Sequence, residues 1–270
     1  MLVGGSLATK AASQVAPDQP IELLGPPPRF VGRGGEKLDA ALEHFGVDPT
    51  GRRCIDAGAS TGGFTDCLLQ RGAAEVVAID VGYGQLHERL RADPRVVNLE
   101  RTNVRSLLPA DIGGTGGVVV ADLSFISLTT VAPALLGLLR PDGGDLVALV
   151  KPQFEAGRLE AARGKGVIRS AEVWRRVLGE VAGAVSSRGA TMMDAMVSPL
   201  TGADGNVEFL VHVATGDRVT ARAEPDLDVV VGAAAALHGT GAPQAGTHGG
   251  GEHAGGTHFT RGRPNTSERC

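Results

Sequence analysis

The stretch Cys54–Phe64, with the sequence CIDAGASTGGF, decides the fold of this chain. An apolar strand start leads into Asp56, then into a glycine turn at Gly58, and a helix is expected to begin near Phe64. A Rossmann-like α/β domain uses this strand–turn–helix unit to seat a nucleoside cofactor at the N-terminus of a helix. The stretch therefore predicts an α/β domain with a nucleoside site.

The glycine pattern also bears on which cofactor is bound. A dinucleotide fingerprint requires Gly-x-Gly-x-x-Gly, and Ser60 stands where its second glycine would be. That glycine lets the backbone approach a pyrophosphate, and Asp56 adds negative charge nearby. Both features favour a cofactor without phosphate, of which S-adenosylmethionine is the common one. The cofactor contacts predicted in this stretch are Asp56, Gly58, Ser60, Gly62, Gly63 and Phe64.

Composition excludes several classes of protein. The chain has 270 residues and a formal net charge of −4, so any contact with nucleic acid must rest on a local basic surface. We find no apolar run of about 18 residues, the length of a membrane helix, and no secretory signal at the start. Cys54, Cys67 and Cys270 have neither metal-ligand nor disulfide spacing. We expect a reduced cytoplasmic protein without a metal and without a membrane contact.

Apolar runs and helical patterns alternate along the chain. Strands are expected at 53–57, 75–81, 95–99, 117–122, 145–150, 190–197 and 206–214. Helices are expected at 34–45, 62–71, 85–92, 129–140 and 170–187. Helical connections imply a mostly parallel seven-stranded sheet covered on both faces. The short connection before the final strand permits only an antiparallel pairing, so we expect an antiparallel last strand, as in Rossmann-like methyltransferases.

Composition divides the chain into three parts. Residues 1–28 hold short strand patterns and end in the stiff Pro26–Pro28 linker. Residues 29–238 hold the α/β pattern. Residues 239–270 are rich in Gly, His, Thr and Pro, and we expect a disordered tail there.

Polar residues close several of the expected strands. Asp80 follows the glycine turn by about 20 residues, a position from which an acid binds both ribose hydroxyls of an adenosine cofactor. NAD proteins share this feature, so Asp80 does not choose between cofactors. Val81 belongs to the same predicted site, and Asn103 and Val104 are predicted to meet the adenine edge.

Four charged residues are placed for chemistry. Asp122 and Lys151 end apolar strands, where the ligand crevice of an open α/β sheet lies. Glu208 stands within an apolar strand, and Lys37 opens the first helix of the α/β domain. Because an embedded charge is costly unless it is paired, we expect Lys151 to pair with Glu208.

The order Lys37, Asp122, Lys151, Glu208 resembles the K-D-K-E tetrad of FtsJ-type ribose 2′-O-methyltransferases. Longer motifs are similar to the TlyA family, also known as hemolysin A. They are Arg33–Leu38, Asp80–Leu86, Ala121–Ser127 and Val150–Glu155. The resemblance implies an S-adenosylmethionine-dependent enzyme that methylates the ribose 2′-hydroxyl of cytidine in 16S or 23S rRNA.

In that resemblance the tetrad is catalytic. Lys151 acts as the base or orients the hydroxyl, Lys37 supplies a second cation, and Asp122 and Glu208 hold the lysines. An ordinary lysine is protonated at neutral pH, so the predicted base needs desolvation or a neighbouring cation.

Substrate recognition is expected from the basic residues near the crevice and from the start of the chain. The family begins with an S4-type RNA-binding domain, and residues 1–28 are similar to its last portion, so we expect a remnant left by a late-assigned start or a truncation. The expected partner is ribosomal RNA or a ribosomal subunit, bound by a monomer. The predicted RNA contacts are Arg29, Arg33, Arg158, Arg163, Lys165 and Arg169.

Two other classes of function stay open. One is an NAD-dependent oxidoreductase, against which Ser60 and the lack of a catalytic His or Tyr-x-x-x-Lys pattern count. The other is a non-catalytic RNA-binding or membrane-lytic protein, for which we find no amphipathic basic helix.

Overall fold

The computed structural model describes residues 1–8, 14–22, 24, 28–157, 160, 162, 164–220 and 224–238. All of the described residues belong to one compact unit. The tail predicted at 239–270 lies outside the described residues. The predicted boundaries at 28/29 and 238/239 stay predictions.

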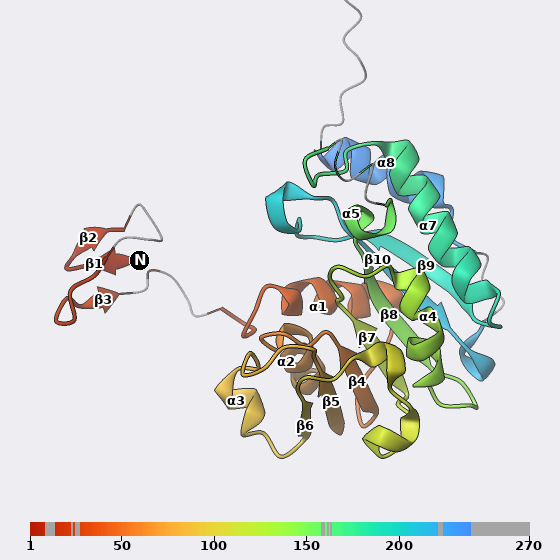
Figure 1. The fold of residues 1–270 in the computed structure, drawn as a ribbon, viewed down its shortest axis with the longest axis horizontal. Helices are drawn as coiled ribbons and strands as arrows, with labels where there is room; N and C mark the ends of the chain where they lie inside the picture. The colour runs from red at the N-terminus through yellow and green to blue at the C-terminus, as the bar shows by residue number, and fades with distance from the viewer. Residues whose placement is uncertain are drawn as a thin grey trace, which may run out of the picture. The chain divides into compact units, whose positions relative to one another are not determined.

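A small antiparallel sheet forms at the N-terminus, with its strands in the order β2-β1-β3 (Figure 1). Its strands are β1 (Leu2–Val3), β2 (Ser6–Leu7) and β3 (Ile21–Glu22). β1 and β3 lie where short strands were expected, whereas β2 was not predicted. That they belong to a remnant of an RNA-binding domain stays a prediction.

The main sheet has seven strands, as expected, and they lie in the order β6-β5-β4-β7-β8-β10-β9. β10 is antiparallel to both neighbours, so the last strand of the chain lies inside the sheet and β9 forms the edge. The strands are β4 (Arg53–Ala57), β5 (Glu75–Ile79), β6 (Val96–Leu99), β7 (Val118–Ala121), β8 (Asp145–Val150), β9 (Thr191–Val197) and β10 (Phe209–Ala214).

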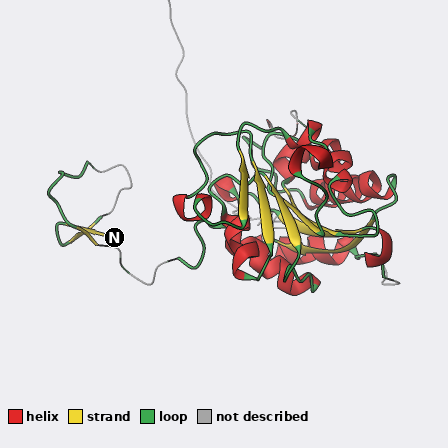
Figure 2. Cartoon of the chain, turned by 90° about the horizontal axis from the view of Figure 1, so that it is seen from below, coloured by secondary structure: helices red, strands yellow, loops and turns green. Residues whose placement is uncertain are grey.

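Helices cover both faces of this sheet (Figure 2). One face packs against α1 (Gly34–Phe45), α2 (Gly63–Gln70) and the segment of α3 (Glu88–Arg91). The other packs against α4 (Leu128–Gly137), α7 (Ala171–Ser186) and α8 (Leu227–His238). Alternate strand residues point to opposite faces, so Cys54 joins the first core and Ile55 the second. The short elements are α5 (Pro152–Glu155), η1 (Val104–Ser106), η2 (Pro109–Ile112), η3 (Ala203–Gly205) and η4 (Gly216–Arg218).

The boundaries differ from expectation in ways that matter for the site. β5 and β7 end at Ile79 and Ala121, and β10 begins only at Phe209. The helix expected at 85–92 is shorter, because the segment from Val81 to His87 folds as turns. α8 was not predicted, since its run of Val and Ala has no clear polar side.

The topology brings the candidate residues to one edge of the sheet. β4 lies between β5 and β7, so the strand order reverses at the glycine turn. Ligands bind at this switch point, outside the carboxyl ends of the parallel strands. Asp80, Asp122 and Lys151 each follow one of those strands directly. Because β10 runs in the opposite direction, Glu208 at its start lies at the same edge.

Candidate active site

The glycine turn after β4 has a backbone that only a few residues tolerate. Gly58 has a φ of +86°, and a Cβ there would lie 2.4 Å from the carbonyl oxygen of Asp122. A side chain at this position would therefore push the segment after β7 away. Ser60 also has a positive φ, of +49°, and its backbone N–H donates to Asp80 Oδ2 at 2.8 Å.

Asp80 connects the glycine turn to the segment that follows β5. Its Oδ1 accepts from the Gly82 N–H at 2.7 Å, and its Oδ2 accepts from Ser60. A carboxylate has about four acceptor sites, so two backbone N–H groups leave room for the two hydroxyls of a ribose. The bonds to the backbone also fix the direction in which the remaining lone pairs point.

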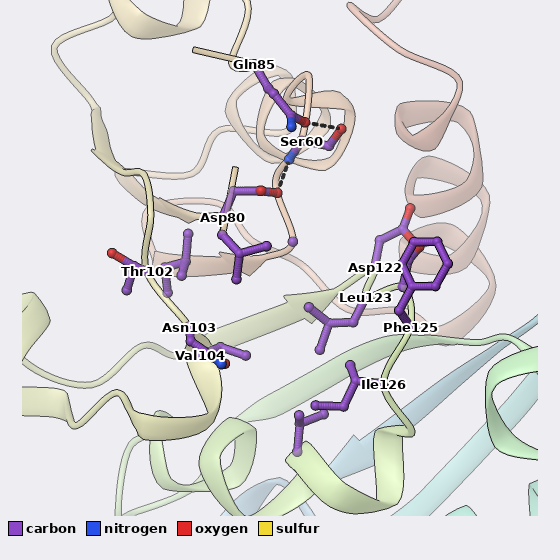
Figure 3. A pocket seen from close by; sticks show the side chains of 15 residues that line it. Ser60, Asp80, Gln85, Thr102, Asn103, Val104, Asp122, Leu123, Phe125 and Ile126 are labelled. Atoms are coloured by element: carbon purple, nitrogen blue, oxygen red, sulfur yellow. Dashed lines mark hydrogen bonds between the residues drawn. The ribbon is translucent and has the colours of Figure 1, made fainter. Parts of the chain in front are cut away.

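A cavity of about 430 Å³ opens beside Asp80 (Figure 3). This volume falls within the range of small-molecule sites, roughly 300–1,000 Å³. It is lined by Val81, Asn103 and Val104, the residues predicted to contact a nucleoside. The side-chain oxygen of Asn103 accepts from the Arg105 N–H at 3.0 Å, so its amide nitrogen is the group left for a ligand. Apolar walls come from Ile79, Val81, Val104, Leu123, Ile126 and Val131.

The residues present fit a cationic nucleoside better than a dinucleotide. Asp80 offers acceptors for a ribose, and the apolar walls suit an adenine ring. Asp56, Asp80 and Asp122 surround the glycine turn closely enough for the last two to raise the pKa of the first. Asp80 and Asp122 line the cavity, and two carboxylates there disfavour a pyrophosphate and favour a ligand that carries positive charge.

Asp56 itself does not line the cavity. It shares the side of β4 that faces α2, where the Thr65 hydroxyl donates to its Oδ2 at 2.6 Å. Its Oδ1 is buried with no hydrogen-bond partner among the described residues. Burial, with help from Asp122 and Asp80, raises the pKa of Asp56 to about 7. The direct contact predicted from Asp56 to a cofactor does not fit this position, because its side chain is fully buried and bonded to Thr65.

A smaller cavity of about 220 Å³ adjoins the first one. The two cavities share Gly58, Ser60 and Asp122. Lys37 and Phe64 line the smaller one, together with Gly63. Gly62 lines neither cavity. Its φ is +97°, and Leu90 occupies the space where its Cβ would be.

Two ion pairs stand at this edge of the sheet. Lys37 Nζ lies 2.5 Å from Glu208 Oε2, and both side chains are less than a tenth exposed. Lys151 Nζ lies 2.6 Å from Asp122 Oδ1, without the alignment of a hydrogen bond, and donates to Ser124 Oγ at 2.9 Å. The expected Lys151–Glu208 pair is therefore wrong. Glu208 reaches α1 instead, since α1 packs beside the start of β10.

Comparisons with known proteins agree with this geometry. A family model described as FtsJ-like methyltransferase matches residues 30–215. This chain belongs to the FtsJ-like methyltransferase family. The match spans the main sheet from before α1 to the end of β10, and so includes both ion pairs and both cavities.

Relatives within the FtsJ-like family confirm the resemblance to TlyA. The chain is 50% identical over 214 residues to the 16S/23S rRNA (cytidine-2′-O)-methyltransferase TlyA of Mycobacterium tuberculosis, covering 79% of each chain. It is 38% identical over 213 residues to Hemolysin A of Brachyspira hyodysenteriae, covering 78% of this chain and 88% of the relative. A solved structure of a hemolysin candidate from Streptococcus thermophilus superposes with a TM-score of 0.71 at 41% identity, covering 80% of this chain and 78% of that one.

The predicted RNA contacts of this FtsJ-like domain fall in different places. Arg33 lines the smaller cavity. Arg29 pairs with Asp39 and stacks on Phe30, so part of its charge is neutralised. Lys165 and Arg169 are exposed. Arg158 and Arg163 lie outside the described residues.

The loop that carries Lys165 is attached to the site. Asn206 Nδ2 donates to the carbonyl of Gly166 at 2.9 Å, and Asn206 Oδ1 accepts from the Ile168 N–H at 3.1 Å. Asn206 precedes Glu208 by two residues. A basic loop expected to close over substrate is thus anchored at this end.

Several residues that line the large cavity were not predicted. Half of them come from the segment after β7, within the motif Ala121–Ser127. Glu155 holds this segment, because it accepts from the Ser127 hydroxyl at 2.6 Å and the Leu128 N–H at 2.7 Å. The additional lining residues with polar or aromatic groups are Gln85, Thr102, Ser124 and Phe125.

Proposed function

We propose that this protein transfers a methyl group from S-adenosylmethionine to the ribose 2′-hydroxyl of a cytidine in ribosomal RNA. The observation that carries the proposal is the pair of lysine–carboxylate contacts beside a nucleoside-sized cavity. The relative from Mycobacterium tuberculosis, half identical to this chain, is named for the same reaction on 16S and 23S rRNA. Membership of the FtsJ-like methyltransferase family supports methyl transfer.

We assign the larger cavity to the nucleoside part of the cofactor. Asp80 would hold the ribose, while Val81 and Val104 would contact the adenine. When it is bound, S-adenosylmethionine supplies a methyl group already activated by its sulfonium. What remains for the protein is positioning and proton removal.

We assign those tasks to the tetrad. Lys151 lies between Asp122 and Ser124, both of which line the larger cavity. From there it would orient the ribose hydroxyl and take its proton as the new O–C bond forms. Lys37 would remain a fixed cation that favours the neutral form of Lys151 and stabilises negative charge on the ribose oxygen. Glu208 holds Lys37 in that place.

The two alternatives have less support. An NAD-dependent oxidoreductase would place a pyrophosphate beside the carboxylates of Asp80 and Asp122, at a turn that lacks the second glycine. For a membrane-lytic role, none of the helices in the described part of the chain is long and apolar enough to cross a membrane. Calorimetric titration with S-adenosylmethionine and with NAD separates the two cofactor proposals, since only one of them should bind.

The substrate places the protein with ribosomes, so we propose a cytoplasmic enzyme. A monomeric state stays a prediction that sedimentation analysis tests. In the described residues no group of His, Cys, Asp and Glu side chains is arranged to hold a metal ion.

The decisive experiment incubates the protein with methyl-labelled S-adenosylmethionine and with 30S subunits, 50S subunits or free rRNA from cells that lack this modification. We expect label on the ribose of one cytidine or a few, mapped by mass spectrometry of nuclease fragments. Lys151→Ala serves as the inactive control. Label on a base, or no label on any of the RNAs, would overturn the proposal.

A further inference from the structure

Asn206 is a buried polar residue that the proposed reaction does not use. It is 3% exposed and stands two residues before Glu208. Its Nδ2 donates to the carbonyl of Gly166 at 2.9 Å, and its Oδ1 accepts from the Ile168 N–H at 3.1 Å. Because an amide nitrogen only donates and an amide oxygen only accepts, these two backbone groups fix the orientation of the amide. Asn206 therefore holds the segment around Gly166 with both polar atoms of its side chain.

The segment that Asn206 holds is a tight turn. The Val167 N–H donates to the carbonyl of Gly164 at 3.0 Å. The two residues between them, Lys165 and Gly166, have φ of +51° and +87°. A turn with positive φ at both central residues suits glycine, whereas lysine is strained there, and such strain persists only where the surroundings enforce it. The hydrogen bonds from Asn206 supply one such constraint.

The chain after the turn is fixed in the core. Ile168 is 5% exposed, and its carbonyl accepts from the indole N–H of the fully buried Trp174 at 3.1 Å. Both backbone groups of Ile168 are thus hydrogen-bonded, one to Asn206 and one to Trp174. Lys165 and Arg169, which lie on either side of Ile168, are exposed. Neither of them forms an ion pair with another residue in the part of the chain that the structure describes.

We propose that Asn206 is a positioning residue that presents Lys165 and Arg169 to the phosphates of the RNA substrate. The proposal rests on the proposed function for the identity of that substrate. In a chain with a net charge of −4, contact with RNA needs local cations that no carboxylate neutralises. Without the bonds from Asn206 the turn would open, and both charges would lose their fixed position near Glu208. Affinity for RNA then falls although no charge has been removed.

Limited proteolysis measures the anchoring directly. Wild type and Asn206→Leu, whose side chain has a similar shape and no polar atom, are digested with trypsin. Cleavage after Lys165 is followed by mass spectrometry, with cleavage after the exposed Arg188 as the internal reference. The loss of two hydrogen bonds favours local opening, so we expect cleavage after Lys165 to be faster by about 10-fold in the variant. Calorimetry should give an unchanged affinity for S-adenosylmethionine.

RNA binding measures what the anchoring is for. Affinities for ribosomal subunits and free rRNA are determined over a range of salt concentrations. Lys165→Ala with Arg169→Ala removes only exposed side chains, so the fold should be retained, and the slope of log affinity against log salt should become shallower by about 2. The control is Arg140→Ala with Arg188→Ala, which removes the same charge from the opposite edge of the sheet, where β8 and β9 begin.

The same measurement then separates positioning from a general effect on the fold. We expect Asn206→Leu to weaken RNA binding on the order of 10-fold by itself, and to have no further effect when Lys165 and Arg169 are already alanine. The positioning role is overturned if the double alanine variant binds RNA as the wild type does. It is also overturned if Asn206→Leu weakens binding equally in both backgrounds, or resists trypsin as the wild type does. A wild type that binds RNA as described but methylates none overturns the proposed reaction alone.

Discussion

Removing Glu208 should destabilise the fold as well as stop catalysis. Its side chain is 3% exposed and that of its partner Lys37 is 8% exposed, so Glu208→Ala leaves a buried ammonium without a counter-charge. Breaking a buried ion pair from one side costs about 3–5 kcal/mol. For a domain of this size each kcal/mol lowers Tm by about 2–4 °C, so we expect Tm to fall by about 6–20 °C.

Urea unfolding followed by circular dichroism measures this cost. The matched control is Arg175→Ala, which breaks an ion pair with Asp228 whose side chains are 45% and 78% exposed. An exposed pair contributes at most about 1 kcal/mol, so this variant should be close to wild type. Replacing both buried partners, in Lys37→Met with Glu208→Leu, should recover most of the stability and none of the activity.

A substitution at Gly202 offers a second way to disturb the Lys37–Glu208 ion pair. A Cβ added at Gly202 would lie 2.1 Å from Glu208 Oε1. Gly202→Ala should therefore displace Glu208 and weaken its contact with Lys37, even though no charge is removed. The reasoning is refuted if Glu208→Ala costs less than about 1 kcal/mol, the limit for an exposed pair.

Three further predictions concern the site. Lys151→Ala should abolish methyl transfer and leave cofactor affinity within a few-fold in calorimetry; loss of binding as well would point to a structural role. Asp80→Asn should weaken cofactor binding about 10- to 100-fold while kcat at saturation changes little, and unchanged affinity contradicts the ribose assignment. Asp56→Asn should remove a pH dependence of stability. Burial raises the pKa of Asp56 from 3.8 to about 7, so the folded state retains this proton above the pH at which the unfolded chain releases it. The free energy of unfolding of the wild type should fall by up to about 4 kcal/mol relative to that of the variant as pH rises from about 4 to 7. If urea unfolding gives the same difference between the two proteins at pH 5 and at pH 8, this reasoning is contradicted.

The positions of the strand-end residues were predictable because they follow from local pattern. An apolar run that stops at a charged residue marks the end of a buried strand, and parallel strands end at one edge. Asp80, Asp122 and Lys151 were placed correctly on this basis alone. The first helix of the α/β domain was equally clear, since its apolar side ends at Gly46, whose φ of +67° suits a helix end.

The partners of these residues could not be predicted in the same way. Lys37 and Glu208 are 171 positions apart, and only the insertion of β10 beside β8 brings them together. The direction of Asp56 depends on which face of β4 packs against α2, and the alternation of the strand does not tell the two faces apart. The conformation of Phe125 depends on contacts from α5, which no local pattern reveals.

The difference between the two ion pairs argues for a division of labour between the lysines. Lys37 pairs with a carboxylate whose side chain is only 3% exposed, so the position of Lys37 is fixed by the fold. Lys151 faces a carboxylate that is 25% exposed, with a neutral hydroxyl as its second partner. Asp122 and Ser124 also line the larger cavity, so Lys151 is held beside the space assigned to the cofactor. We therefore propose Lys151 as the residue that removes the proton and Lys37 as the supporting cation.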